Sequence, residues 1–99
     1  MNTISLFIGH NVNGTPALSS DEIITETCNT LQIDGLTVRE AQGVWKGELE
    51  ETSEVLIFTD SKKLSSWNEL KKLVSKLARH LQQEAILVTL NGQPEFIAA

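Results

Sequence analysis

Four glutamates cluster between positions 48 and 54: Glu48, Glu50, Glu51 and Glu54. Carboxylates serve enzymes as general acids and bases, but this chemistry needs two groups that face each other in a pocket. These four flank a predicted turn and continue along the strand after it. The sequence therefore favours a solvated acidic face at this place, and it predicts no catalytic residue there.

Other residues with catalytic or metal-binding side chains are sparse. His10 and His80 are the only histidines, and Cys28 is the only cysteine. Their spacing matches no metal site, and Cys28 falls on the predicted buried face of a helix. The chain also contains no serine-nucleophile elbow and no phosphate-binding glycine loop. We therefore expect no catalytic residue, no metal and no cofactor.

The composition is that of a single folded domain, which we expect to span residues 1–99. The net charge of −5 argues against nucleic-acid binding. Residues 6–9 resemble the first-strand motif of RNA-recognition domains, but the basic third-strand signature of those domains is missing. The lone cysteine, the lack of a signal-peptide pattern and the lack of a long apolar run predict a cytoplasmic protein without membrane contact.

Two helices are expected, from about residue 20 to 31 and from about residue 66 to 83. Each begins with a serine followed three residues later by a glutamate, the pattern of a capping box: Ser19 with Glu22, and Ser66 with Glu69. The second helix has the clearest apolar stripe, formed by Leu70, Leu73, Val74, Leu77 and Leu81.

The strands are expected at residues 3–9, 36–46, 50–59 and 85–90, with a short strand at 94–98 after an Asn-Gly turn. The order β-α-β-β-α-β is typical of the ferredoxin-like fold, in the α+β class. It predicts an antiparallel sheet with both helices on one face and a short C-terminal edge strand. The strands at 3–9 and 50–59 should be central, since residues 55–58 are apolar on both parities.

The strand at 36–46 changes the parity of its apolar residues near Arg39 and Glu40. Before this point the apolar residues, Leu36 and Val38, occupy even-numbered positions. After it the apolar or small residues, Ala41, Gly43 and Trp45, occupy odd-numbered positions. One extra residue in the strand would restore the alternation, so we predict a β-bulge there. Gly47 predicts the turn that follows.

The sheet face without helices is also expected to carry large apolar side chains. The candidates are Phe7, Leu56, Phe58 and Leu87, although Val55 and Ile57 take the central positions if the strand has the other parity. An apolar patch of this kind is uncommon on monomers and predicts a homodimer through this open face. The alternative is that the terminal hairpin or Trp45 covers part of it.

Trp45 and Gly43 lie on one side of the strand, where the glycine leaves room for the indole or for a ligand. One interpretation is structural: Trp45 covers the open face and Gly43 accommodates the bulge. The other is a small-molecule pocket with Trp45 as its platform, Arg39 as an anion contact and His10 from the loop after the first strand. The candidate ligand-binding residues are thus His10, Arg39, Gly43 and Trp45.

Four short motifs follow one another along the chain: D-G-L-T-V at 34–38, A-x-G-x-W at 41–45, E-x-S-x-V-L at 51–56 and Q-E-A at 83–85. This pattern resembles a family of small bacterial proteins of unknown function, many of which are exported lipoproteins. The resemblance implies the ferredoxin-like fold and implies no activity. Because this chain shows no export signal, the family's location is not carried over.

Together these observations predict a non-enzymatic, dimeric protein that binds or sequesters a small molecule. One alternative is an interaction module of phage or mobile-element type that acts on a host protein. A further alternative is an enzyme of the dimeric α/β-barrel type, which the lack of an acid, base or nucleophile disfavours.

Overall fold

The computed structural model describes all residues from Met1 to Ala99. The chain forms β1 (Asn2–Gly9), β2 (Asn11–Val12), β3 (Thr15–Pro16), α1 (Ser20–Leu31), β4 (Thr37–Trp45), β5 (Glu48–Thr59), α2 (Trp67–His80), β6 (Ala85–Leu90) and β7 (Gln93–Ala98). The predicted loop after β1 contains the short β2–β3 hairpin, which turns at Asn13 and Gly14 with positive φ angles. Neither helix is long and apolar enough to cross a membrane.

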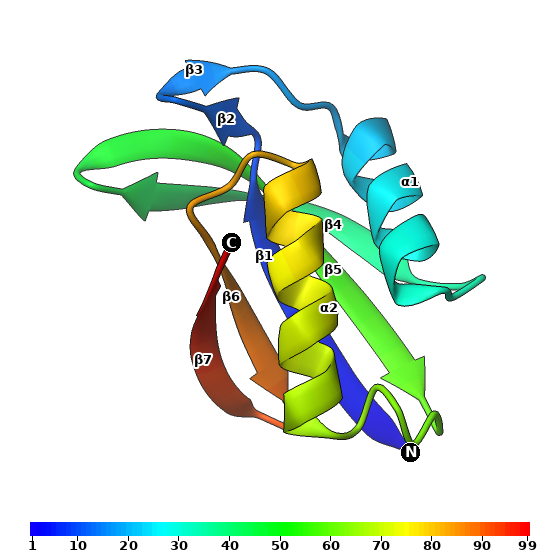
Figure 1. Cartoon of the computed structure of the whole chain (residues 1–99). Coiled ribbons are helices and arrows are strands. Elements are labelled where there is room, and N and C mark those ends of the chain that lie inside the picture. Colours follow the sequence, from blue (N-terminus) through cyan, green and yellow to red (C-terminus); the bar gives the residue numbers. More distant parts are fainter.

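The main sheet has five antiparallel strands in the order β4-β5-β1-β6-β7. Both helices cover one face of this sheet, and β1 lies at its centre (Figure 1). The ferredoxin-like prediction is confirmed, including the edge strand β7 at the C-terminus. The opposite sheet face carries no helix and is called the open face below.

Alternating strand residues build the core between the sheet and the helices. The fully buried members include Ile4, Leu6, Ile8, Val55, Ile57, Ile86 and Val88 from the strands and Leu70, Val74 and Leu77 from α2. Burying each such side chain contributes roughly 1.5–3 kcal/mol to folding. Since Val55 and Ile57 face the helices, Leu56 and Phe58 lie on the open face.

The two helix starts differ. At α1 the Ser19 hydroxyl accepts a hydrogen bond from the Glu22 N–H at 3.1 Å, and the Glu22 carboxylate accepts one from the Ser19 N–H at 3.2 Å. This confirms the first capping box. At α2, Ser66 is the N-cap but its side chain makes no capping hydrogen bond, so the second prediction is wrong. Glu69 lies instead near the ammonium of Lys72, at 3.8 Å.

The predicted β-bulge is also wrong. The pairing of β4 with β5 runs without interruption from Thr37 opposite Leu56 to Trp45 opposite Glu48. The two strands are joined by a two-residue turn at Lys46 and Gly47, both with positive φ, as a type I′ hairpin requires. The parity change has another cause. The first half of β4 lies beside the helix layer, whereas the second half extends beyond it (Figure 1). Its last residue, Trp45, contacts Phe96 on β7 and so lies over the open face.

Candidate functional site: the hairpin pocket

The tip of the β4–β5 hairpin reaches across the open face to the far edge of the sheet. Trp45 is the last residue of β4, the strand at one edge, and Phe96 lies on β7, at the other edge. Their ring centroids are nevertheless only 6.1 Å apart, with the ring planes tilted by 44°. Such a contact requires the hairpin to curl over the sheet, and the curl encloses a hollow.

This hollow, the hairpin pocket, has a volume of about 590 Å³. Its lining falls into three groups. Small residues on neighbouring strands form its floor: Gly9, Ala41, Gly43 and Ala85. Large apolar side chains rise around them: Phe7, Trp45, Leu87 and Phe96. Polar side chains complete it, among them Asn11, Glu50, Thr52 and Gln83. The small residues leave space between the large apolar side chains.

Glu50 lies on the pocket floor, where Gly9 makes room for it. A Cβ atom added to Gly9 would overlap the Glu50 carboxylate, so any larger residue would displace that group. The backbone N–H of Asn11 donates a hydrogen bond to Glu50 Oε2 at 2.9 Å. The side-chain amide of Gln83 in turn donates to the carbonyl of Asn11 at 3.0 Å. The carboxylate is therefore held in one position from two segments distant in sequence.

Gly43 plays a similar part on the neighbouring strand. A Cβ atom at this position would lie 2.9 Å from the hydroxyl oxygen of Thr52. The absence of a side chain at Gly43 thus lets Thr52 occupy the floor beside Glu50. The sequence interpretation that Gly43 accommodates a bulge is excluded, because the strand contains none.

An ion pair also crosses the mouth of the pocket. The ammonium of Lys46, in the hairpin turn, lies 3.0 Å from the carboxylate of Glu84, in the segment between α2 and β6. Exposed ion pairs of this type contribute roughly 0–1 kcal/mol. The contact between Trp45 and Phe96 also joins the hairpin to the far edge of the sheet.

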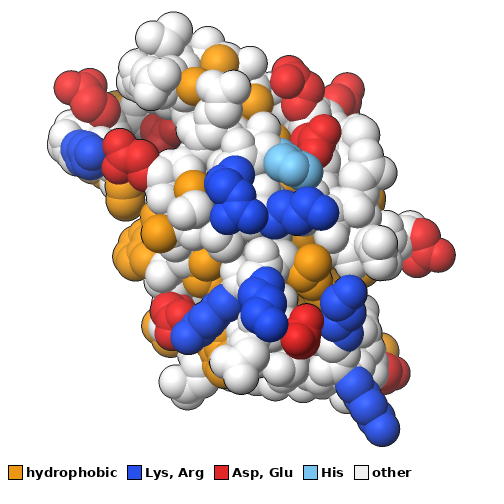
Figure 2. All heavy atoms as spheres, in the orientation of Figure 1, with side chains coloured by type: hydrophobic (Ala, Val, Ile, Leu, Met, Phe, Trp, Pro, Cys, Tyr) orange, Lys and Arg blue, Asp and Glu red, His pale blue; other side chains and the backbone are white.

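The charge of the molecule is unevenly distributed. Lysine and arginine side chains gather over α2 and the segment before it, on the helix side of the molecule (Figure 2). The hairpin pocket, on the other side of the sheet, is lined by three glutamates and one lysine: Glu48, Glu50, Glu84 and Lys46. Because Lys46 is paired with Glu84, the pocket has an excess of negative charge that suits a cationic ligand.

Of the four predicted ligand residues, the structure brings Gly43 and Trp45 together in the hairpin pocket. Arg39 lies on the same sheet face but farther along β4, where its Nε donates to Glu54 at 2.9 Å. It does not line the pocket. Trp45 is 40% exposed, so it covers the open face only in part.

His10 lies away from the pocket, on the helix side of the sheet. Its Nε2 is 2.8 Å from the hydroxyl of Ser53, which is fully buried and faces the helix layer. The His10 carbonyl accepts hydrogen bonds from the N–H groups of Ala17 and Leu18, at 3.0 and 2.9 Å. His10 thus anchors the base of the β2–β3 hairpin, and Ser53 is too enclosed to act as a nucleophile.

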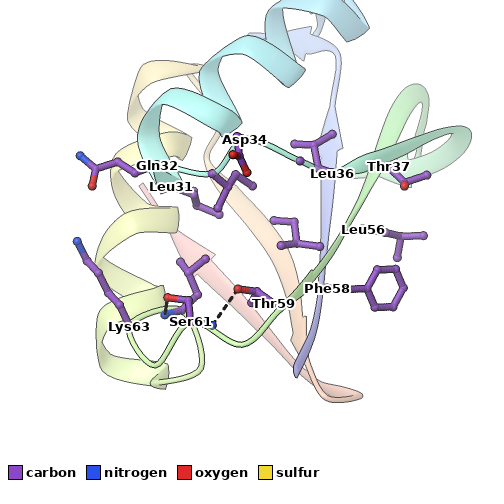
Figure 3. Close-up of a pocket in the computed structure, with 14 residues that line it drawn as sticks. Leu31, Gln32, Asp34, Leu36, Thr37, Leu56, Phe58, Thr59, Ser61 and Lys63 are labelled. Carbon is purple, nitrogen blue, oxygen red and sulfur yellow. Dashed lines mark hydrogen bonds between the residues drawn. The ribbon is translucent and has the colours of Figure 1, made fainter. Parts of the chain in front are cut away.

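A second hollow of about 510 Å³ lies at the opposite end of the sheet, beside the segment from α1 to β4 (Figure 3). It is lined by aliphatic side chains together with Asp34, Ser61 and Lys63. In Figure 3, Leu56 and Phe58 point away from the helices, toward the open face. This hollow has one aromatic side chain, Phe58, and the hydroxyls of Thr59 and Ser61 accept hydrogen bonds from backbone N–H groups of the same segment, at 3.0 and 3.3 Å.

The sequence did not predict Glu50, Asn11 or Gln83 as ligand-site residues, and Gln83 was noted only as part of the Q-E-A motif. Glu50 was grouped with its neighbours as part of a solvated face, yet in the structure it is half-buried and hydrogen-bonded. The available signal was its place in β5, where it has the same parity as Thr52 and Glu54 and faces the open side. Asn11 contributes its backbone N–H, and the role of a backbone group cannot be recognised from the type of residue.

Comparison with known protein families and with curated protein sequences finds no match. Two solved structures match the fold, both of a phage SAM lyase. One, in complex with S-methyl-5′-thioadenosine, has a TM-score of 0.80 at 18% identity. The other, in the apo state, has a TM-score of 0.76 at 20% identity. Each match covers 99% of this chain and 89% of the other.

These matches contradict the expectation of a non-enzymatic binding or sequestering protein, because both structures are of an enzyme. The expectation rested on the lack of a visible acid, base or nucleophile set in the sequence. Over nearly its whole length, the chain has a fold similar to that of a phage SAM lyase.

Proposed function

We propose that this protein is a lyase that cleaves S-adenosylmethionine (SAM) in the hairpin pocket and releases S-methyl-5′-thioadenosine. The observation that carries the proposal is the full-length likeness, at a TM-score of 0.80, to a SAM lyase that holds this thioether. The pocket's size, its aromatic walls and its charge support the same substrate.

The size and walls of the pocket suit the adenosine part of SAM. Small-molecule sites commonly enclose about 300–1,000 Å³, and this one encloses about 590 Å³. Trp45 is partly exposed toward it and offers an aromatic face for the adenine ring. Stacking of a base on an aromatic side chain is worth about 1–3 kcal/mol.

The charge of the pocket suits the rest of the molecule. SAM carries a sulfonium, an ammonium and one carboxylate, so it has a net positive charge. The glutamates around the pocket attract such a cation. After cleavage the thioether product is neutral and loses this attraction, which favours its release.

The bond changes of the reaction can be balanced without any protein nucleophile. The bond between sulfur and the γ-carbon of the amino-acid chain breaks, and its electron pair stays on sulfur, which becomes neutral. The substrate's own carboxylate oxygen attacks that γ-carbon and closes a four-carbon lactone. No water is added and no proton is transferred, in keeping with a lyase.

On this route the protein positions the substrate and supplies no acid or base. Both reacting groups belong to one substrate molecule, so the protein contributes by holding that molecule in the conformation that puts the carboxylate oxygen in line with the bond between the γ-carbon and sulfur. Charge is neutralised as the lactone forms, so the apolar walls at Phe7 and Leu87 favour the transition state over the charged substrate. The lack of a catalytic residue in the sequence is compatible with this chemistry.

The proposal includes a homodimer through the open face. Phe58 is 61% exposed there, and Leu56 beside it is partly exposed. A second copy of the chain would cover both side chains. Because SAM is an intracellular metabolite, the proposal also includes action in the cytoplasm. The motif resemblance to exported bacterial proteins stays a prediction.

The direct test of the proposed activity is to incubate the purified protein with SAM and to follow the products by liquid chromatography and mass spectrometry. The expected result is a rise of methylthioadenosine with an equal amount of the lactone, well above the rate without protein. Formation of homoserine carrying solvent oxygen on its γ-carbon would indicate hydrolysis instead. No product above the protein-free control would refute the proposal.

A further inference from the structure

We infer that Glu50 is the acceptor for the α-ammonium group of the substrate, and that Gly9 and Gln83 are positioning residues for its carboxylate. This inference rests on the proposed function, since it assigns one charged group of SAM to one residue of the hairpin pocket. It assigns a specificity contact at the pocket floor, where the sequence indicated only a solvated acidic face.

Glu50 has one carboxylate oxygen that is available to a ligand. Oε2 of this carboxylate accepts the Asn11 N–H, whereas Oε1 has no hydrogen-bond partner within the chain. The side chain is half-buried and lines the pocket. A fixed carboxylate with one uncommitted oxygen is suited to a charge-assisted hydrogen bond from a ligand N–H.

SAM has two cationic groups that Glu50 could contact, the sulfonium and the α-ammonium. An ammonium has three N–H donors, and a sulfonium has none, so only the ammonium can complete the hydrogen bonding of Oε1. The sulfonium also loses its charge in the reaction. A carboxylate placed against it would stabilise the substrate more than the transition state and would slow cleavage. The ammonium keeps its charge throughout, so binding it carries no such penalty.

Three residues keep the Glu50 carboxylate in place: Gly9, Asn11 and Gln83. Gly9 supplies the space in which it lies, because a Cβ atom there would overlap it. Asn11 supplies the N–H, and the Gln83 amide fixes the Asn11 peptide by donating to its carbonyl at 3.0 Å. Gln83 therefore influences the position of the Glu50 carboxylate through the Asn11 peptide.

The test compares three related ligands in calorimetric and kinetic measurements on the full chain. S-Adenosylhomocysteine has the ammonium but no sulfonium charge, and methylthioadenosine has neither. For Glu50→Gln we expect binding of S-adenosylhomocysteine to weaken about 10- to 100-fold, the range for loss of one charge-assisted hydrogen bond. The KM for SAM should rise similarly, while methylthioadenosine binding should change less than about threefold.

Glu51→Gln is the matched control, because it removes the same charge one residue away, on the opposite side of β5, from a side chain outside the pocket. It should leave all three ligands within about threefold of the unmodified protein, since screening weakens a distant exposed charge. An equal effect of Glu51→Gln and Glu50→Gln would mean that only general charge is involved, and it would overturn the inference.

The positioning residues are tested with Gly9→Ala and Gln83→Met. Both should weaken S-adenosylhomocysteine about 3- to 10-fold relative to methylthioadenosine, because the carboxylate is displaced or loosened. Gln83→Glu has the same length but no N–H₂ donor, and it should fail to restore the affinity. A merely structural role would lower the affinity for both ligands together, and that result would overturn the positioning role.

The outcomes separate this inference from the proposed function. If Glu50→Gln raises the KM for SAM but leaves S-adenosylhomocysteine unchanged, the carboxylate contacts the sulfonium and the ammonium assignment is wrong. If all three ligands bind and none responds to Glu50→Gln, the inference fails while the proposed pocket stands. If the unmodified protein binds none of the three, the proposed function itself fails.

Discussion

Trp45 and Phe96 lie on the two outermost strands of a five-stranded sheet, and their ring centroids are 6.1 Å apart. Strands in a sheet are separated by about 4.8 Å, so residues on the outer strands of a flat sheet would lie much farther apart. The contact shows that the long β4–β5 hairpin folds back over the open face. It therefore creates the pocket and also covers part of the apolar surface.

Replacing Trp45 by alanine should remove most of the methylthioadenosine binding and cost only part of the stability that a buried tryptophan provides. Truncation of a fully buried aromatic side chain costs about 3–5 kcal/mol, and Trp45 is 40% exposed, so we expect roughly 1–3 kcal/mol. Urea unfolding and ligand-induced thermal shifts measure the two effects. A loss above that range with an unchanged thermal shift would show that Trp45 is only a structural cover.

Leu77→Ala should destabilise the fold by about 2–5 kcal/mol, because Leu77 is fully buried in the stripe of α2 that faces the sheet. The comparison by urea denaturation needs Lys76→Ala as its control, since Lys76 is on the exposed side of the same turn. The control should change the unfolding free energy by less than about 0.5 kcal/mol. Equal effects of the two substitutions would contradict the assigned packing of the helix.

Phe58→Glu should convert the expected homodimer into a monomer without unfolding the domain. The side chain is 61% exposed on the open face, so a charge there is tolerated in the monomer but is costly in an apolar interface. Analytical ultracentrifugation at micromolar protein measures the change. If the unmodified protein already sediments as a monomer at high micromolar concentration, the dimer proposal is wrong.

The sequence was sufficient to predict the fold because the patterns that determine it are local. Alternation at Ile4, Leu6 and Ile8 indicated a strand with one buried face, and the leucine spacing of α2 indicated its buried stripe. The order of the elements then left few arrangements. The predicted bulge failed because the parity change near Arg39 has a nonlocal cause. It marks where β4 leaves the helix layer, and that depends on how far the hairpin extends.

The candidate site was predictable only in part. A glycine beside a tryptophan, Gly43 and Trp45, indicated space beside an aromatic ring, and both residues line the pocket. Glu50 could not be separated from its acidic neighbours, because its position depends on a backbone N–H and on the empty space at Gly9. His10 was expected to contact the ligand from the loop after the first strand, whereas the end of β1 directs it to Ser53 on the other side of the sheet.

The central claim is that the hairpin pocket holds the methylthioadenosine part of SAM. The chain contains two tryptophans: Trp45 lines this pocket, and Trp67 begins α2, with the Lys71 ammonium 5.7 Å from its ring centre. In a ¹⁵N-correlated NMR spectrum they give two indole N–H signals, which Trp67→Phe assigns. Titration with methylthioadenosine should shift the Trp45 signal in a saturable manner and leave the Trp67 signal in place. Binding that shifts only Trp67, or neither signal, would contradict the account.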